Sequence, residues 1–115
     1  MSLHSFTPIL NGQKRNADIG VLYDPGRRRE KVLAIAFQEA LNNRTGLRIR
    51  RNYPYRGNAD GFTAALRKEF DERHYIGIEI EINQAPIMGN RSQGRKIAES
   101  ICLSLHQIEK PEVTL

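Results

Sequence analysis

The sequence of 115 residues has a single cysteine, no tryptophan and no apolar run long enough to span a membrane. One cysteine cannot form an internal disulfide, so the chain is not a disulfide-stapled secreted module, and a reducing cytoplasm is the expected compartment. No signal-peptide segment follows Met1. Cys102 lies near Ile97, Ile101 and Leu105, and this spacing predicts a small core residue rather than a nucleophile.

Familiar catalytic motifs are also missing. There is no His-x-x-His pair and no cysteine cluster, so a complete three-ligand zinc site is not visible in the sequence. No serine stands in a Gly-x-Ser-x-Gly turn, which leaves a serine-hydrolase hypothesis without support. A lone histidine on a strand, such as His4, is more often part of the hydrogen-bonded structure than a metal ligand. His74 and His106 are predicted to be structural.

Positive charge is what the chain has in excess. Its formal net charge is +5, and arginines are grouped at 27–29 and again at Arg48, Arg50, Arg51 and Arg56. This balance favours anionic partners, among them phosphates and small carboxylates. No nucleic-acid motif and no series of stacking aromatics accompanies the arginines, so nucleic-acid binding is less favoured than a solvated basic surface.

Hydrophobic periodicity predicts four strands and three helices. Strands are expected over residues 2–8, 19–23, 47–50 and 75–84, and helices over 29–43, 62–70 and 92–107, with a loop or hairpin at 9–17 that contains the turn signal Asn11-Gly12. In the second helix Phe62, Leu66 and Phe70 recur at i, i+4 and i+8, the spacing of an apolar stripe. The order β-β-α-β-α-β-α is typical of an α/β protein. We therefore expect one layered α/β/α domain with a mixed sheet over residues 1–115.

The stretch from Tyr75 to Gln84 is the most informative part of the sequence. Three isoleucines, at positions 78, 80 and 82, alternate with Glu79, Glu81 and Asn83. The two-residue period predicts a strand with one apolar and one polar face. The polar face is either solvated or delivers a carboxylate to a reaction centre, and this segment alone favours neither alternative.

Residues 52–61 are a loop by composition, rich in asparagine, glycine and proline. Ligands of open α/β sheets bind in the crevice beyond the carboxyl ends of strands. Tyr53 and Tyr55 are therefore candidates for substrate contact, although packing of a rigid loop accounts for them equally well.

Four segments in order resemble the N-formylglutamate amidohydrolase family. They are His-Ser-Phe-Thr-Pro at 4–8 with Gly12 and Arg15 after it, Ile-Gly-Val-Leu-Tyr at 19–23, Asn-Tyr-Pro-Tyr at 52–55 and Ile-Glu-Ile-Asn-Gln at 80–84. The resemblance extends to about residue 89. It implies a fold similar to zinc carboxypeptidases and hydrolysis of a small acidic N-acyl amino acid such as N-formylglutamate.

The resemblance also implies roles for individual residues. His4 is expected to be a zinc ligand, and Glu81 the carboxylate that activates a metal-bound water. Glu79 lies on the same strand face and is a second candidate for that carboxylate. The loop would shape the substrate pocket through Asn52, Tyr55, Arg56 and Gly57, with Arg15 close to it.

The chain departs from the family pattern in two ways. Many members carry arginine where this chain has Asn83 or Gln84, which puts the identity of the substrate in doubt. Members also have a long region before the His-Ser-Phe-Thr-Pro strand, which is expected to supply the other zinc ligands. The resemblance thus corresponds to the C-terminal part of such a hydrolase. The alternative is a non-catalytic binding or assembly module without a complete zinc site, and self-association is the expected partner interaction.

Overall fold

The computed structural model describes residues 1–58 and 61–109, and it confirms the predicted α/β class with a mixed sheet and three helices. The elements along the chain are β1 (Ser2–Phe6), β2 (Ile9–Leu10), β3 (Gln13–Lys14), β4 (Ile19–Leu22), α1 (Arg28–Arg44), β5 (Ile49–Arg51), α2 (Phe62–Glu69), β6 (Glu79–Asn83) and α3 (Arg91–Glu109). The two short strands β2 and β3 are the hairpin expected at 9–17, turning at Asn11 and Gly12, which both have positive φ.

The main sheet has the order β1-β6-β4-β5. Strands β1 and β6 are parallel, as are β4 and β5, whereas β4 and β6 are antiparallel. The first and last strands of the chain segment are thereby brought side by side, with His4 in register with Glu81. Strands β1 and β5 form the two edges of the sheet.

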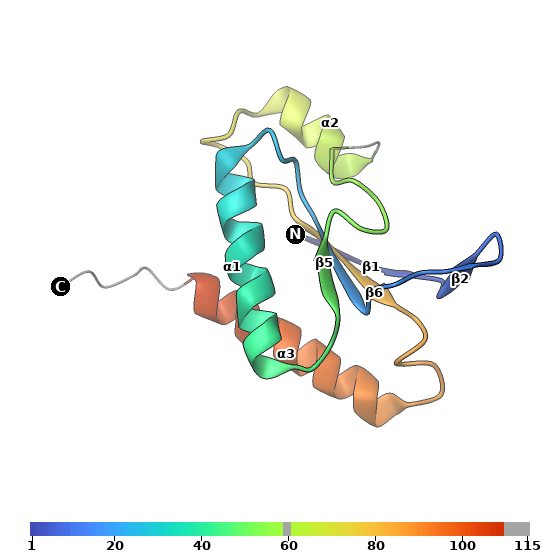
Figure 1. Cartoon of the computed structure of the whole chain (residues 1–115). Helices are drawn as coiled ribbons and strands as arrows, with labels where there is room; N and C mark the ends of the chain where they lie inside the picture. The colour runs from blue at the N-terminus through green and yellow to red at the C-terminus, as the bar shows by residue number, and fades with distance from the viewer. Residues whose placement is uncertain (59–60, 110–115) are drawn as a thin grey trace.

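One face of the sheet is apolar and covered by α1 and α3, which cross each other on that side (Figure 1). Isoleucines of β4 and β6 pack there against buried residues of both helices, among them Phe37, Leu41, Ile97 and Ile101. Burial of these side chains supplies most of the favourable free energy of folding. The predicted strand period is confirmed, because Ile78 and Ile80 are buried in this core.

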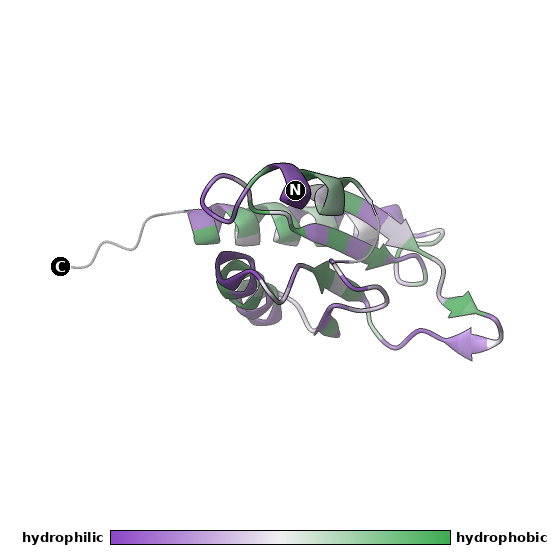
Figure 2. Cartoon of the chain, turned by 90° about the horizontal axis from the view of Figure 1, so that it is seen from above, coloured by the Kyte–Doolittle hydropathy of each residue, from purple (hydrophilic) through white to green (hydrophobic). Residues whose placement is uncertain are grey.

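The opposite face carries the polar residues of β6 and has a thinner cover. Here Gly20 of β4 lies directly under the carbonyl group of Tyr53, so a Cβ atom at position 20 would collide with the loop. The first turn of helix α2 contacts this face, where Thr63 hydrogen-bonds to Glu79. The hairpin of β2 and β3 projects away from the body, and its residues Ile9 and Leu10 are exposed (Figures 1 and 2).

Helix α2 is joined to α1 by a buried ion pair. The Glu30 carboxylate is fully buried and lies 2.8 Å from the Arg67 guanidinium, whose exposed fraction is also low. The same carboxylate accepts backbone N–H bonds from Asp24 and Gly77. Arg67 in turn donates to the carbonyl groups of Gly57 and Gly77. This network ties α1, α2 and the segment before β6 into one unit.

Two details of the predicted helices are wrong. Cys102 is exposed, because the buried stripe of α3 runs through Ile97, Ile101 and Ser104, and residue 102 lies about 100° further round the helix. In α2 the aromatic residues at both ends of the predicted stripe are exposed, Phe62 at 77% and Phe70 at 46%. The buried residue of that helix is Thr63, in its first turn, which hydrogen-bonds to Glu79 of β6.

Candidate functional site

The candidate site is the polar face of the sheet at β1 and β6. His4 and Glu81 are direct partners across these parallel strands, and Gly20 is the partner of Glu81 on the other side. Residues that face each other across neighbouring strands point to the same side of a sheet. The structure therefore brings together the two residues that the sequence analysis placed at the centre of the chemistry.

Burial raises the pKa of the Glu81 carboxyl group above its ordinary value. The charges of His4 and Arg15 oppose this increase, and the charge of Glu79 adds to it. Only 6% of Glu81 is exposed, so its ionised form is poorly hydrated. A carboxylate in such surroundings holds a proton more readily than one in water, as a general base or acid must.

Arg15 lies beside this pair and is held between two aromatic rings. Its guanidinium is 5.5 Å from the centre of the Phe6 ring and 5.2 Å from that of Tyr55, and it donates a 3.0 Å hydrogen bond to the Tyr55 hydroxyl. The residue is 8% exposed, yet none of the ion pairs found among the described residues includes it. Its charge acts on Glu81 from beyond ion-pair distance, and a buried arginine that forms no ion pair among the described residues favours an anionic ligand.

The loop predicted to shape the pocket is fixed by Asn52. Its side-chain oxygen accepts backbone N–H bonds from Tyr23 at 3.0 Å and from Gly57 at 3.1 Å. Gly57 is packed so closely against the backbone of Tyr23 that a Cβ atom would collide with it. In this structure Asn52 and Gly57 hold the loop in place.

Two other predicted pocket residues lie on the outside of the loop. Tyr55 is half exposed and turns its hydroxyl to Arg15. Arg56 is exposed. Among the described residues we find no contact between Arg56 and either His4 or Glu81. A cavity of about 290 Å³ opens between this loop and the hairpin, and Arg15, Tyr53 and Tyr55 line it together with Leu10.

Thr63, which was not predicted from the sequence, contacts the second candidate carboxylate. The Thr63 hydroxyl donates a 2.6 Å hydrogen bond to Glu79, and only 4% of the residue is exposed. Glu79 is thus held by a neighbour, and Glu81 is the more deeply buried of the two. The one feature of the sequence that could have indicated this contact is the position of Thr63, between apolar residues at the start of the predicted helix 62–70.

The residues of this face fit a zinc site only in part. Within the described residues, no group of three or more histidine, cysteine, aspartate or glutamate side chains could hold a metal ion. His4 and Glu81 offer an imidazole and a carboxylate, which are both zinc donors. A zinc site with three or more protein ligands would need donors from outside the described part of one chain.

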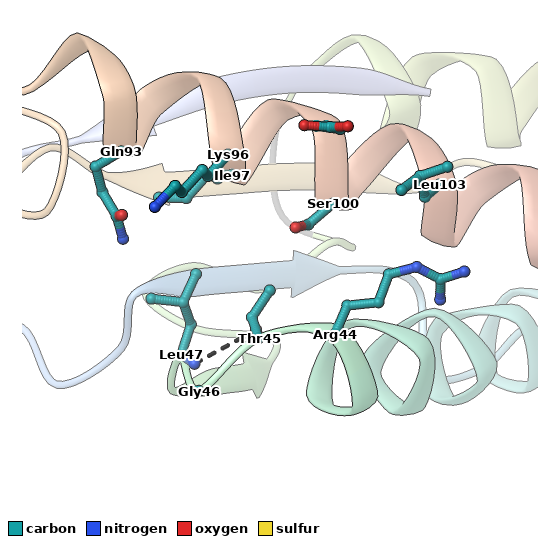
Figure 3. A pocket seen from close by; sticks show the side chains of 10 residues that line it. Arg44, Thr45, Gly46, Leu47, Gln93, Lys96, Ile97, Ser100 and Leu103 are labelled. Carbon is teal, nitrogen blue, oxygen red and sulfur yellow. Dashed lines mark hydrogen bonds between the residues drawn. The ribbon is translucent and has the colours of Figure 1, made fainter.

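A larger cavity, of about 460 Å³, lies on the other side of the sheet between the C-terminal end of α1 and α3 (Figure 3). Arg44 and Lys96 lie on opposite walls of this cavity, and Ile97 and Leu47 supply apolar surface. It shares no residue with the polar face and has neither a histidine nor a cysteine in its lining. Its size alone therefore does not make it the reactive site.

Three further observations bear on the class of protein. Among the described residues, no helix is both long enough and apolar enough to cross a membrane. No protein-family model matches the chain, and no curated protein matches it. Among solved structures, the gene product Atu2144 from Agrobacterium tumefaciens is similar, with 31% sequence identity and a TM-score of 0.63 over 92% of this chain. The match spans 41% of the Atu2144 chain, so this fold occurs there as part of a longer protein.

Proposed function

We propose that the chain is the catalytic part of a zinc-dependent amidohydrolase that cleaves the amide bond of a small acidic N-acyl amino acid, such as N-formylglutamate. The proposal includes membership of the N-formylglutamate amidohydrolase family and action in the cytoplasm. One observation carries it. His4, Glu81 and Arg15 come from three separate segments of the chain and gather on one face of the sheet.

Arg15 suits the carboxylate of such a substrate. Its guanidinium is buried, stacked between Phe6 and Tyr55 and not paired with a carboxylate among the described residues. A substrate carboxylate that replaced water at this point would form a charge-assisted hydrogen bond. This contact would orient the acyl group along the sheet toward Glu81.

Glu81 suits the proton transfer. In hydrolysis, a water oxygen bonds to the acyl carbon, the carbon–nitrogen bond breaks and one proton of that water has to reach the leaving amine. Glu81 would accept the proton and then donate it to the nitrogen. Because burial raises the pKa of Glu81, the acidic limb of kcat/KM is expected above the ordinary titration range of a glutamate. His4 would be one zinc ligand.

The test is hydrolysis of N-formylglutamate by the purified chain, or by a longer protein that contains it, in the presence of zinc. The variant Glu81→Gln is expected to lower kcat by a factor of about 10² to 10⁴ and to leave the zinc content unchanged. The matched control is Glu39→Gln, on the exposed face of α1, which should behave like the native protein. Equal turnover by Glu81→Gln and native protein would contradict the proposal.

The second candidate function is a binding or assembly module without catalysis. The observation that favours it is the partial set of metal donors on the polar face of the described chain. In that case N-formylglutamate would perturb the NMR signals of residues around Arg15 without being cleaved. Hydrolysis that depends on zinc and is lost in Glu81→Gln would exclude this candidate.

A further inference from the structure

The cavity between α1 and α3 has no part in the proposed reaction. Its volume of about 460 Å³ lies within the range of sites that bind small molecules. One wall is the connection from α1 to β5, residues 44–47, and the other is α3 (Figure 3). The lining residues of α3 recur at helical spacing: Gln93, Lys96, Ile97, Glu99, Ser100 and Leu103. None of them belongs to the polar face, so a ligand here would be bound apart from it.

The wall that follows α1 is fixed by hydrogen bonds. The backbone N–H and the hydroxyl group of Thr45 both donate to the Leu41 carbonyl group at 2.9 Å. The Leu47 N–H donates to the Thr45 hydroxyl at 3.4 Å (dashed in Figure 3). Across the gap, the Arg44 guanidinium donates a 2.6 Å hydrogen bond to the Gln107 side chain of α3. The cavity is thus preformed, and a ligand would enter it without the entropic cost of ordering this wall.

The charged side chains of the lining leave a single excess positive charge. Its two cations, Arg44 and Lys96, lie on opposite walls, and Glu99 is its one carboxylate. All three residues are exposed, and none belongs to an ion pair found among the described residues. The Gln107 amide that binds Arg44 is neutral and leaves the guanidinium charge uncompensated. One negative charge from a ligand would balance this lining.

Beneath these exposed charges the lining is apolar. Ile97 is 3% exposed and belongs to the core, and Leu47 packs against the same core. Leu103 adds hydrocarbon surface that is 49% exposed to solvent. The cavity therefore combines an apolar inner surface with a cationic rim, which suits a ligand with an apolar body and one anionic end.

We propose that this cavity binds a small amphipathic monocarboxylate, with its carboxylate between Arg44 and Lys96 and its hydrocarbon body against Leu47, Ile97 and Leu103. Charge-assisted hydrogen bonds would hold one end of the ligand, and removal of hydrocarbon from water would stabilise the other. A dicarboxylate, the class of substrate proposed for the polar face, brings a second charge that this lining does not balance. The proposal is therefore independent of the proposed function.

The experiment is a titration of the isotope-labelled 115-residue chain with phenylbutyrate, followed by two-dimensional NMR. We expect saturable shifts in the signals of residues 44–47 and 93–103, with a Kd of about 1 mM or lower. Two probes of similar size, the neutral phenylbutyramide and the cationic phenylbutylamine, define the charge requirement. Both should bind at least about tenfold more weakly, because neither offers a negative charge to the two cations.

The cationic rim is tested by Lys96→Gln. It should raise the Kd of phenylbutyrate by about threefold to fivefold, as expected for the loss of one exposed ion pair. The matched control is Arg95→Gln, at an exposed neighbour on α3 that does not line the cavity, and it should leave the Kd unchanged. Both variants remove one positive charge from the same helix, so an effect confined to Lys96 shows a local contact.

The apolar surface is tested by Leu103→Ser. It should raise the Kd of phenylbutyrate by about twofold or more, because less hydrocarbon is removed from water on binding. The matched control is Val32→Ser, at a similarly exposed apolar residue of α1 (59%), which should leave the Kd unchanged. Circular dichroism of all variants confirms that they fold.

Three outcomes overturn the proposal. The first is the absence of shifts at residues 44–47 and 93–103 in about 10 mM phenylbutyrate. The second is a set of shifts at Arg15, Tyr53 and Tyr55 instead, which would place the ligand in the cavity beside the hairpin. The third is equal affinity for phenylbutyramide, or equal losses in Lys96→Gln and Arg95→Gln, which would exclude a specific contact with the carboxylate. Hydrolysis of N-formylglutamate is measured separately and should be unchanged in Lys96→Gln, so failure of either proposal leaves the other standing.

Discussion

The two faces of the sheet differ in kind, although the same strands make both. On the face toward α1 and α3, isoleucines of β4 and β6 pack against Phe37 and Leu41, and the side chains that these two strands place there are apolar and mostly buried. On the other face stand a histidine, two glutamates and an asparagine, under a loop and the end of one helix.

The difference shows where the free energy of folding comes from and where it is lost. The apolar face gains free energy by removing hydrocarbon from water. On the polar face, buried polar groups need hydrogen-bond partners, because burial without them costs free energy. The polar groups of this face find such partners to different degrees. The Asn83 amide donates from Nδ2 to the Ala17 carbonyl group and accepts at Oδ1 from the Ala85 backbone N–H, whereas the pKa of Glu81 is raised by burial.

The largest change in the free energy of unfolding is expected at the ion pair that joins α1 to α2, the helix that contacts the polar face. Glu30→Ala would leave the buried Arg67 without its partner and two backbone N–H groups, of Asp24 and Gly77, without an acceptor. We expect a loss of about 3–5 kcal/mol in the free energy of unfolding, measured by urea denaturation. Glu39→Ala, on the exposed side of the same helix, should change it by less than about 0.5 kcal/mol.

A loss of similar or slightly smaller size is expected on the apolar face. Phe37 is 1% exposed and packs at the centre of the core, so Phe37→Ala creates a cavity. We expect it to lower the free energy of unfolding by about 3–5 kcal/mol without removing any hydrogen bond. Thermal denaturation would show the change, and Val32→Ala on the same helix is the control. A small effect of Phe37→Ala would mean that the core is not where the structure places it.

The smallest change in the free energy of unfolding is expected at Glu81 on the polar face. Here the substitution should raise the free energy of unfolding at neutral pH instead of lowering it. The pKa of Glu81 is higher in the folded chain than in the unfolded chain, so folding takes up a proton between these two values. The free energy of unfolding therefore falls as pH rises from the ordinary value of 4.5 through the raised one, and stays lower above it. Glu81→Gln removes this decrease.

The measurement is the Tm of native protein and Glu81→Gln as a function of pH. The two should agree at acidic pH, where Glu81 is protonated, and the variant should be more stable at neutral pH. A variant that is less stable than the native protein at neutral pH would show that ionised Glu81 is stabilising, and that its neighbours outweigh its burial.

Much of the fold could be predicted from local patterns. The alternation of isoleucine and polar residues at 78–83 predicted β6, and apolar spacing predicted α1 over 29–43 against the observed Arg28–Arg44. Asn11 and Gly12 marked the hairpin. These signals are local because a strand or an amphipathic helix is recognisable from its own period.

The errors come from contacts that no local pattern contains. Cys102 and the aromatic residues Phe62 and Phe70 were placed by helix periodicity, but which side of a helix is buried depends on the element it meets. The third predicted strand, at 47–50, begins two residues later in the structure, at Ile49. Element boundaries are commonly uncertain by this amount.

By itself, the sequence determined the class of fold, the strand with two unlike faces and the residue types available for chemistry. Only the tertiary structure decided that His4 lies beside Glu81, that Arg15 lies over the Phe6 and Tyr55 rings, and that β1 is an edge strand of the sheet formed by the described residues. The physical reason is that strand pairing and sheet order depend on contacts between distant segments, whose side chains carry no record of the partner they meet.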